Sequence, residues 1–315
     1  MGKENETTTD GFLLLGLFSD SKAPEFLISI ILLTYVIAVA GNSILILLIW
    51  LDSHLHTPMY ILLSQLSVMD LTLSSSTVTK MATDFFSGKK NISRIGCGTQ
   101  MFFYLTVGIA ECVFLTLMAY DRYVAICNPL RYLVLMSPRV CLLMVMTAWV
   151  GSVLTSLSHT IYIMHFPTCG SREIHHFFCE VMAFLKLSCE DTTFYEKVVL
   201  VSGTTLIFIP FGLILASYAL IFLTVLRMNS PKGKNKALVT CTSHLTVVSL
   251  YFGPAMIIYM TPGSSLSPEL DQHLFVFDTI VTPLLNPLIY SLRNKEVIRA
   301  LQRVMWKKKM YLCNH

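Results

Sequence analysis

The chain has 315 residues, of which 54% are hydrophobic and only 13% are charged, and its formal net charge is +4. Soluble domains carry about 25% charged residues, so this composition excludes an ordinary soluble domain and indicates an integral membrane protein. The basic residues are not gathered into the kind of patch that binds nucleic acid, so we expect the lipid bilayer, and no nucleic acid, as a partner.

The first ten residues are polar and partly acidic, and we expect no cleavable signal peptide. The apolar run at 12–18 is too short and has no basic region before it, so the first span would act as the targeting signal. The triplet Asn5-Glu6-Thr7 is an N-glycosylation acceptor if this end of the chain lies outside the cell.

Seven apolar stretches are each long enough to cross a bilayer as a helix, which takes about 20 residues. They cover about 26–51, 58–85, 98–126, 140–164, 196–227, 237–260 and 270–292. The basic segment that follows is typical of an amphipathic helix lying on the membrane surface. We therefore predict an all-α membrane protein, a single seven-transmembrane helix bundle over residues 1–315 with a short amphipathic C-terminal helix.

An odd number of spans places the two termini on opposite sides of the membrane. Fourteen of the 23 lysine and arginine residues fall on the side of the C-terminus: Arg122, Arg131, Arg139, Arg227, Lys232, Lys234, Lys236, Arg293, Lys295, Arg299, Arg303, Lys307, Lys308 and Lys309. The positive-inside rule then predicts an extracellular N-terminus, residues 1–25, and a cytoplasmic tail, residues 293–315.

Asp121 and Arg122 stand side by side where the third apolar stretch ends. An acid beside a base is costly inside hydrocarbon, but at the membrane edge both groups can meet water and headgroups. The pair is either a polar latch that opens during signalling or a simple stop signal that ends the span. At a rise of about 1.5 Å per residue it lies about 37 Å from Cys97, so the two belong to opposite membrane faces.

Four polar residues are predicted at similar depth near the middle of the membrane, each on a different span: Asn42, Asp70, Glu111 and Asn286. If they face one another, they make an oxygen-lined cavity for a hard cation and water. The alternative is a structural hydrogen-bond network in which one of the acids is protonated.

The outer half of the bundle is a candidate binding cavity. On one face of span three, at intervals of three and four residues, lie Tyr104, Leu105, Gly108, Ile109 and Cys112. Residues at comparable depth on spans five, six and seven are Ser202, Leu206, Phe252, Ala255, Tyr259 and Thr279. Together they would surround a mostly apolar space that suits a small apolar ligand, although ordinary helix packing produces the same pattern.

Four of the nine cysteines fall on the extracellular side: Cys97, Cys169, Cys179 and Cys189. That compartment is oxidising, so we expect disulfides, for which four cysteines allow three pairings. The alternative is a metal site that uses the nearby histidines His165, His175 and His176, although no two of these cysteines show close ligand spacing.

The chain shows no catalytic constellation, such as a glycine-rich phosphate loop, a zinc-protease histidine pair or a Ser/His/Asp set, so we do not expect an enzyme. A membrane transporter or channel is the alternative to a receptor. It would carry internal repeats and several paired intramembrane charges, and neither is evident in the sequence.

Four motifs occur in register along the chain: LHTPMY at 55–60, MAYDRYVAIC at 118–127, KALVTCTSHL at 236–245 and PLLNPLIYSLRN at 283–294. In this order and spacing they resemble the vertebrate odorant (olfactory) receptors, which are rhodopsin-like G-protein-coupled receptors. The resemblance covers essentially the whole chain. The segment HHFFCE at 175–180 is similar to the terrestrial, class II branch of that family.

The resemblance implies a plasma-membrane receptor that binds a small volatile ligand in the outer cavity and raises cyclic AMP through a stimulatory, olfactory-type G protein. It implies the disulfides Cys97–Cys179 and Cys169–Cys189. It implies no required cofactor, but a sodium ion held by Asp70 and Glu111, with Asn42 and Asn286 as further candidates. The activation switch that it implies comprises Asp121, Arg122, Tyr123, Tyr218 and Tyr290.

The chain departs from the family pattern in span six. Where the family usually has Phe-Tyr-Gly, this chain has Tyr251-Phe252-Gly253, and Pro254 stands where a small hydroxyl residue is more common. The phenol is thereby moved by one position, about 100° around a helix of 3.6 residues per turn.

Overall fold

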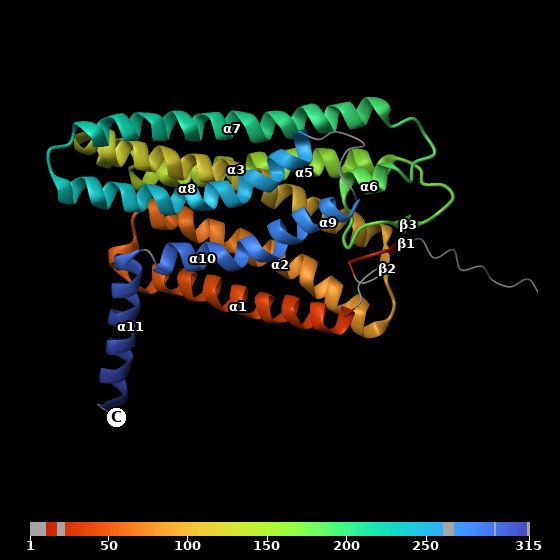
Figure 1. Ribbon diagram of the computed structural model, residues 1–315, viewed down its shortest axis with the longest axis horizontal. Coiled ribbons are helices and arrows are strands. Elements are labelled where there is room, and N and C mark those ends of the chain that lie inside the picture. The colour runs from red at the N-terminus through yellow and green to blue at the C-terminus, as the bar shows by residue number, and fades with distance from the viewer. Residues whose placement is uncertain (1–10, 18–22, 261–267, 293, 314–315) are drawn as a thin grey trace, which may run out of the picture.

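The computed structural model describes residues 11–17, 23–260, 268–292 and 294–313, and its long helices run side by side in one bundle (Figure 1). In chain order these are α1 (Pro24–Leu51), α2 (Pro58–Ser87), α3 (Arg94–Cys127), α5 (Pro138–His165), α7 (Thr193–Arg227) and α8 (Pro231–Met260). The last span is built from α9 (Pro268–Val276), the π-helical turn η3 (Phe277–Val281) and α10 (Thr282–Leu292).

Among the described residues, six spans are long and apolar enough to cross a membrane, namely α1, α3, α5, α7, α8 and the composite span α9–α10. The seventh, α2, is 30 residues long but rich in serine and threonine. It runs alongside the others and packs against α1, α3 and α5, so its polar groups find partners inside the bundle. The predicted all-α fold of seven spans is confirmed.

Local sequence explains where several helices begin. Proline stands in the first turn of α1, α2 and α5, where its missing N–H leaves no hydrogen bond unmade. The α3 helix starts after Ser93, whose hydroxyl accepts a hydrogen bond from the Gly96 N–H at 3.0 Å. Helices α7 and α8 begin three and six residues before the positions expected from hydropathy. Their first turns are polar, so a search for apolar stretches does not include them.

The central helix is α3, which contacts α2, α5, α7 and α8. Its core side chains, such as Phe114 and Leu115, are fully buried. The outer helices present apolar side chains outward instead, and Trp50 on α1 is 73% exposed. Because the bilayer is as apolar as these side chains, the outward faces of α1, α5 and α7 fit a lipid environment.

Helices α1 and α10 approach each other closely at Gly41. A Cβ atom added there would lie 3.2 Å from Cγ of Pro287, which is tighter than ordinary van der Waals contact. The glycine thus lets the first and last spans meet, as small residues do between membrane helices.

One end of the bundle carries a small three-stranded sheet (Figure 1). Strand β1 (Gly11–Leu14) lies between β2 (Asn91–Ser93), which is antiparallel to it, and β3 (Glu173–Ile174), which is parallel. Two apolar side chains of β1, Phe12 and Leu14, are buried beneath it. The apolar run at 12–18 was expected only to be too short for a span, and the sheet was not predicted.

The opposite end carries the short elements η1 (Ser53–Leu55), η2 (Pro129–Arg131) and α4 (Tyr132–Leu135), together with α11 (Lys295–Cys313). Helix α11 runs across the axis of the bundle, as expected of a helix lying on a membrane surface (Figure 1). Its Arg303 binds Asp52, with Nε 2.8 Å from Oδ2. Burial acts to raise the pKa of Asp52, but hydrogen bonds from His54 and Arg303 lower it to about 2.

Candidate functional site

A cavity of about 380 Å³ lies in the half of the bundle next to the sheet, enclosed by α3, α5, α7, α8 and the last span. Its wall is mostly apolar and consists of Tyr104, Leu105, Gly108, Ile109, Cys112, His159, Ile163, Glu180, Val181, Met182, Thr193, Glu196, Lys197, Val199, Leu200, Ser202, Gly203, Leu206, Ile207, Tyr251, Pro254, Ala255, Ile258, Phe275 and Asp278. A space of this size and lining suits a small organic molecule.

The structure brings together eight of the eleven residues expected around this cavity: Tyr104, Leu105, Gly108, Ile109, Cys112, Ser202, Leu206 and Ala255. Two others do not line it. Phe252 is fully buried and packs against Phe211, with ring centroids 5.4 Å apart, and Thr279 is fully buried with its hydroxyl donating to the Phe275 carbonyl at 2.7 Å. The side chain of Tyr259 lies outside the described residues.

Tyr251 occupies the cavity wall instead of Phe252. Its hydroxyl donates to the Gly108 carbonyl at 2.6 Å and lies 3.2 Å from Sγ of Cys112. The phenol that is displaced by one position in the sequence therefore ties α8 to α3 at the wall of the cavity. Which face of α8 turns inward depends on packing against α3 and α7, and the residue pattern of α8 alone does not reveal it.

The loop between α5 and α7 closes the outer end of the cavity. The disulfide Cys97–Cys179 joins this loop to the start of α3, and the Cys179 N–H donates to Oε1 of Gln100 at 2.9 Å. A second disulfide, Cys169–Cys189, closes the loop on itself. The short helix α6 (Val181–Leu185) follows, and with it Glu180, Val181 and Met182 reach the cavity wall. These are the pairings that the family resemblance implied.

Aromatic side chains of the same loop pack against the bundle. Phe178 lies between Tyr104 and Phe275, with ring centroids 5.0 and 5.3 Å away, and His176 packs against Phe178 and Phe275. Burial lowers the pKa of His176 to about 3, so the ring is neutral at physiological pH. In the described part of the chain, no three His, Cys, Asp or Glu side chains are grouped closely enough to hold a metal ion.

Glu180 is a half-buried acid of this cap. Its Oε2 accepts a hydrogen bond from the Ala183 N–H at 2.6 Å and caps α6. Burial raises the pKa of Glu180 to about 7, and the N–H groups of Met182 and Ala183 act against that rise. No sequence pattern indicated that this loop residue reaches the cavity, because loop folding depends on contacts far apart in the chain.

The mid-membrane polar residues are buried as expected. Both carboxylate oxygens of Asp70 accept from Nδ2 of Asn286 at 3.1 Å. Asn42 turns its Nδ2 to the carbonyls of Ala38 and Pro283. Three buried oxygens of this group have no hydrogen-bond partner in the described structure: Oδ1 of Asn42, Oε1 of Glu111 and Oδ1 of Asn286. Such unsatisfied oxygens fit a hard cation or water.

At the α11 end, Asp121 does not pair with Arg122. Its Oδ1 accepts a hydrogen bond from the hydroxyl of Tyr132 on α4 at 2.8 Å, and no ion pair joins Asp121 to Arg122 within the described residues. The Arg122 charge still acts on Asp121, and it also acts on Tyr218 and Tyr290 inside the bundle. The expected latch between neighbouring residues is replaced by one between α3 and the loop that follows it.

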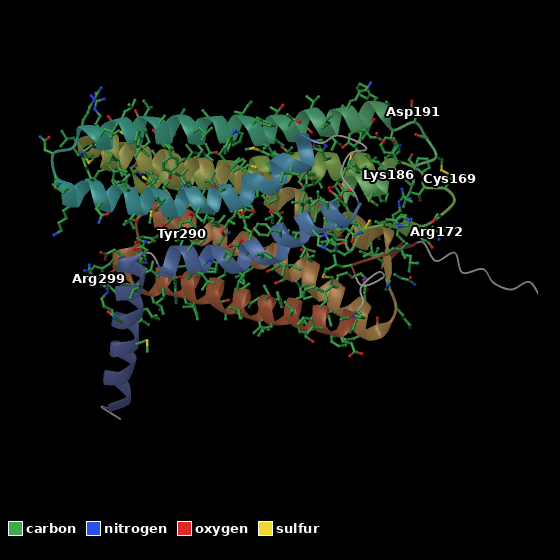
Figure 2. All side chains as sticks on the ribbon, viewed as in Figure 1. Cys169, Arg172, Lys186, Asp191, Tyr290 and Arg299 are labelled. Atoms are coloured by element: carbon green, nitrogen blue, oxygen red, sulfur yellow. A yellow bond between two sulfur atoms is a disulfide. The ribbon has the colours of Figure 1, made fainter. Side chains whose placement is uncertain are left out.

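The inner halves of α7 and α8 are joined by a contact that the sequence reasoning missed. The Tyr218 hydroxyl lies 2.7 Å from Nδ1 of His244, and the two rings are stacked. The hydroxyl of Tyr290, near the same end in Figure 2, is buried without a hydrogen-bond partner among the described residues. Tyr123 is half-buried beside Tyr120.

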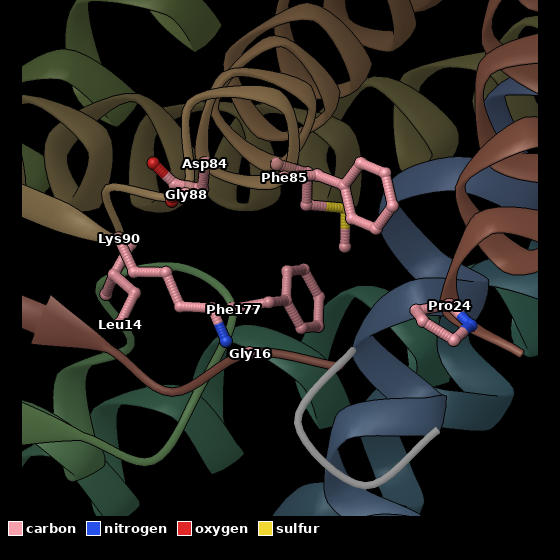
Figure 3. Close-up of a pocket in the computed structure, with 9 residues that line it drawn as sticks. Leu14, Gly16, Pro24, Asp84, Phe85, Gly88, Lys90 and Phe177 are labelled. Carbon is pink, nitrogen blue, oxygen red and sulfur yellow. The ribbon is translucent and has the colours of Figure 1, made fainter. Parts of the chain in front are cut away.

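A second, smaller cavity of about 230 Å³ lies at the sheet end, between β1, the start of α1 and the end of α2 (Figure 3). Phe177 reaches into it from the loop between α5 and α7, opposite Phe85, and Met81 is also part of the lining. No pattern of residues predicted this cavity. The glycosylation acceptor Asn5 lies outside the described residues.

Comparison with known proteins agrees with this architecture. Residues 31–308 match the family model described as olfactory receptor. The chain is 50% identical to human olfactory receptor 2AG2, over 98% of its own length and 97% of that protein. It is 49% identical to human olfactory receptor 2M3, over 98% and 99% of the two chains. It is 52% identical to human olfactory receptor 2L2, over 98% of both chains. Members of this family are multi-pass membrane receptors for odorants that couple to G proteins, and they are not enzymes. The chain belongs to the olfactory receptor family.

Proposed function

We propose that the protein binds a small, mostly apolar volatile molecule in the 380 Å³ cavity and signals this through a stimulatory, olfactory-type G protein that raises cyclic AMP. The observation that carries the proposal is the cavity itself, which is apolar along Leu105, Ile109 and Leu206 and closed by a disulfide-anchored loop. Burying an apolar ligand there gains about 25 cal/mol per Å² of surface removed from water.

Activation would change the arrangement of α7, α8 and the last span. Ligand binding shifts an existing equilibrium only by the difference between its affinities for the two arrangements. The inner end of α8 would move, the Tyr218–His244 contact and the Asp121–Tyr132 bond would loosen, and the G protein would dock on the inner ends of α3, α7 and α8. The position of Arg122 among tyrosines of several helices supports this role.

The sheet end would face outward from the plasma membrane and the α11 end would face the cytoplasm. The positive-inside rule supports this orientation, because the basic residues of the α3–α5 loop, of the start of α8 and of α11 lie at one end of the bundle. The two disulfides at the other end require an oxidising compartment.

A sodium ion would be held between Asp70 and Glu111 in the middle of the bundle. Two carboxylates supply the charge, and the unpartnered amide oxygens of Asn42 and Asn286 are neutral oxygen donors of the kind a hard cation takes. A bound cation would offset the cost of keeping two acids together in a region without water.

Cyclic AMP measured in cells that display the receptor, during a screen of odorants, tests the proposed function. Leu206→Trp would fill the cavity and reduce the response to an active odorant at least about tenfold, which corresponds to about 1.4 kcal/mol of lost binding. The matched control is Leu213→Trp on the same helix, whose side chain is exposed on the outer face. Equal effects of the two variants would argue against the cavity as the binding site.

The switch is tested in the same cells. Arg122→Gln would abolish odorant-evoked cyclic AMP at unchanged surface expression, whereas Arg131→Gln in the exposed α3–α5 loop would not. Solute flux evoked by odorants without any G protein would instead identify a transporter or channel.

A further inference from the structure

Asp278 is an acid in the wall of the mostly apolar cavity. It belongs to η3, the π-helical turn that interrupts the last span, and such turns often place a side chain at a functional site. Among the described residues, none donates a hydrogen bond to its carboxylate. The nearby Tyr251 hydroxyl already donates its proton to the Gly108 carbonyl. The carboxylate thus reaches the cavity without a donor from the protein.

Asp278 lies within electrostatic range of two further buried acids, Asp70 and Glu111. A carboxylate in a region of low dielectric is unfavourable unless a cation or several hydrogen-bond donors compensate it. A ligand that enters the cavity can supply both.

The other ionisable groups of the cavity are engaged at its outer end. Glu196 accepts from the Thr192 hydroxyl at 2.6 Å, Glu180 caps α6, and His159 bonds the Tyr195 hydroxyl through Nδ1 at 2.8 Å. Lys197 is exposed at this end, and its charge acts on Asp191 of the surface loop. Asp278 is therefore the acid in the wall that is available to a ligand's polar group.

We propose that the cavity selects protonated amines, with the ligand's ammonium group against Asp278 and its hydrocarbon part along Leu105, Ile109 and Leu206. This proposal rests on the proposed function, because it assumes that odorants bind in this cavity. A primary ammonium group carries a positive charge and three N–H donors, and its hydrogen bonds to a carboxylate are charge-assisted. An alcohol of the same skeleton offers one donor and no charge.

The oxygen of Tyr251 provides a second acceptor for the ammonium group. Its hydrogen bond to Gly108 fixes the phenol in place with its oxygen at the cavity wall, near Asp278. Bonds from one ligand nitrogen to Asp278 and Tyr251 would orient the ligand tail away from α8 and towards α3 and α7. A quaternary ammonium keeps the charge but has no N–H to donate.

The experiment compares matched pairs of small amines and alcohols with the same carbon skeleton, in cells that display the receptor and report cyclic AMP. In the wild type, amines should be at least about tenfold more potent than their alcohols. Asp278→Asn should reduce amine potency at least about tenfold and change alcohol potency less than about threefold, and Asp278→Glu should keep the preference for amines. The matched control is Glu190→Gln in the exposed loop, which also removes one acidic charge and should change neither series.

Alcohols as potent as the amines in the wild type would overturn the proposal, and this comparison needs no variant to fold. An amine preference that survives in Asp278→Asn at normal surface expression would overturn it as well. If neither series raises cyclic AMP, thermal stabilisation of the purified receptor by each compound decides. Selective stabilisation by amines would then support the amine site while counting against the proposed signalling, and no selectivity would overturn the amine site itself.

Discussion

Tyr251→Phe removes a single oxygen atom and leaves the shape of the α8 face almost unchanged. In the structure that oxygen donates to the Gly108 carbonyl at 2.6 Å and lies 3.2 Å from Sγ of Cys112, in a side chain that is only 7% exposed. A neutral intramolecular hydrogen bond contributes about 0.5–1.5 kcal/mol net. The Gly108 carbonyl can still accept its helical bond within α3, so no buried acceptor is orphaned and the larger penalty does not apply.

We therefore expect the variant to lose about 1 kcal/mol of stability, a fall in Tm of about 1–2 °C for a protein of this size. The assay is thermal unfolding of the purified receptor in detergent. A matched control is Tyr35→Phe, because its hydroxyl also bridges two helices, at 3.1 Å from Ser75, but at a half-buried site. The control should lose less than half as much.

Two results would refute the reasoning. A Tyr251→Phe variant as stable as the wild type would mean that the α3–α8 bond makes no net contribution. An equal loss in Tyr35→Phe would mean that the effect is common to all such tyrosines and does not depend on the cavity wall.

Three further predictions concern positions outside the cavity. In the wild type, the buried His176 has a pKa of about 3, so on acidification the unfolded chain binds a proton first; its contribution to stability is full above about pH 6.5 and declines below that pH. Between about pH 7.5 and about pH 5 the Tm of His176→Phe should therefore fall less than the Tm of the wild type. Equal falls in Tm would contradict this. Arg303→Gln should free α11, and protease should cut that helix faster, whereas unchanged cleavage would show that the Asp52 ion pair does not hold it. Gly41→Val should cost about 1–3 kcal/mol through contact with Pro287, and an unchanged Tm in thermal unfolding would show that the helices can shift apart.

The seven spans could be predicted because apolar length is a local property of the chain. The α3 wall of the cavity, from Tyr104 to Cys112, could also be predicted, since a periodicity of 3.6 residues identifies one face of a helix. The periodicity does not show whether that face turns towards the cavity or away from it. For α3 the orientation was right, but in α8 the inward position is Tyr251 and Phe252 packs elsewhere.

The rest of the site depends on contacts between distant parts of the chain. Glu180 reaches the cavity only because its loop is tied to α3 by the Cys97–Cys179 disulfide. Asp278 lies in a π-helical turn that no residue pattern announces. The hydrogen bond from Tyr132 to Asp121 joins residues eleven positions apart, across the turn after α3. We had expected Asp121 to pair with its immediate neighbour Arg122, because that pairing needs no knowledge of the turn.

The polar composition of α2 has a consequence for how the protein is made. Six spans are apolar enough to leave the translocation channel for lipid on their own, but α2, with its run of serine and threonine at 74–77, is not among them. Inside the finished bundle its Ser67, Ser74 and Thr77 are buried. Until α3 has been synthesised, these buried side chains have only α1 to pack against, so we expect α2 to enter the bilayer together with its neighbours. We therefore expect the joint insertion of the first three spans to limit how much receptor is made, before any encounter with a ligand.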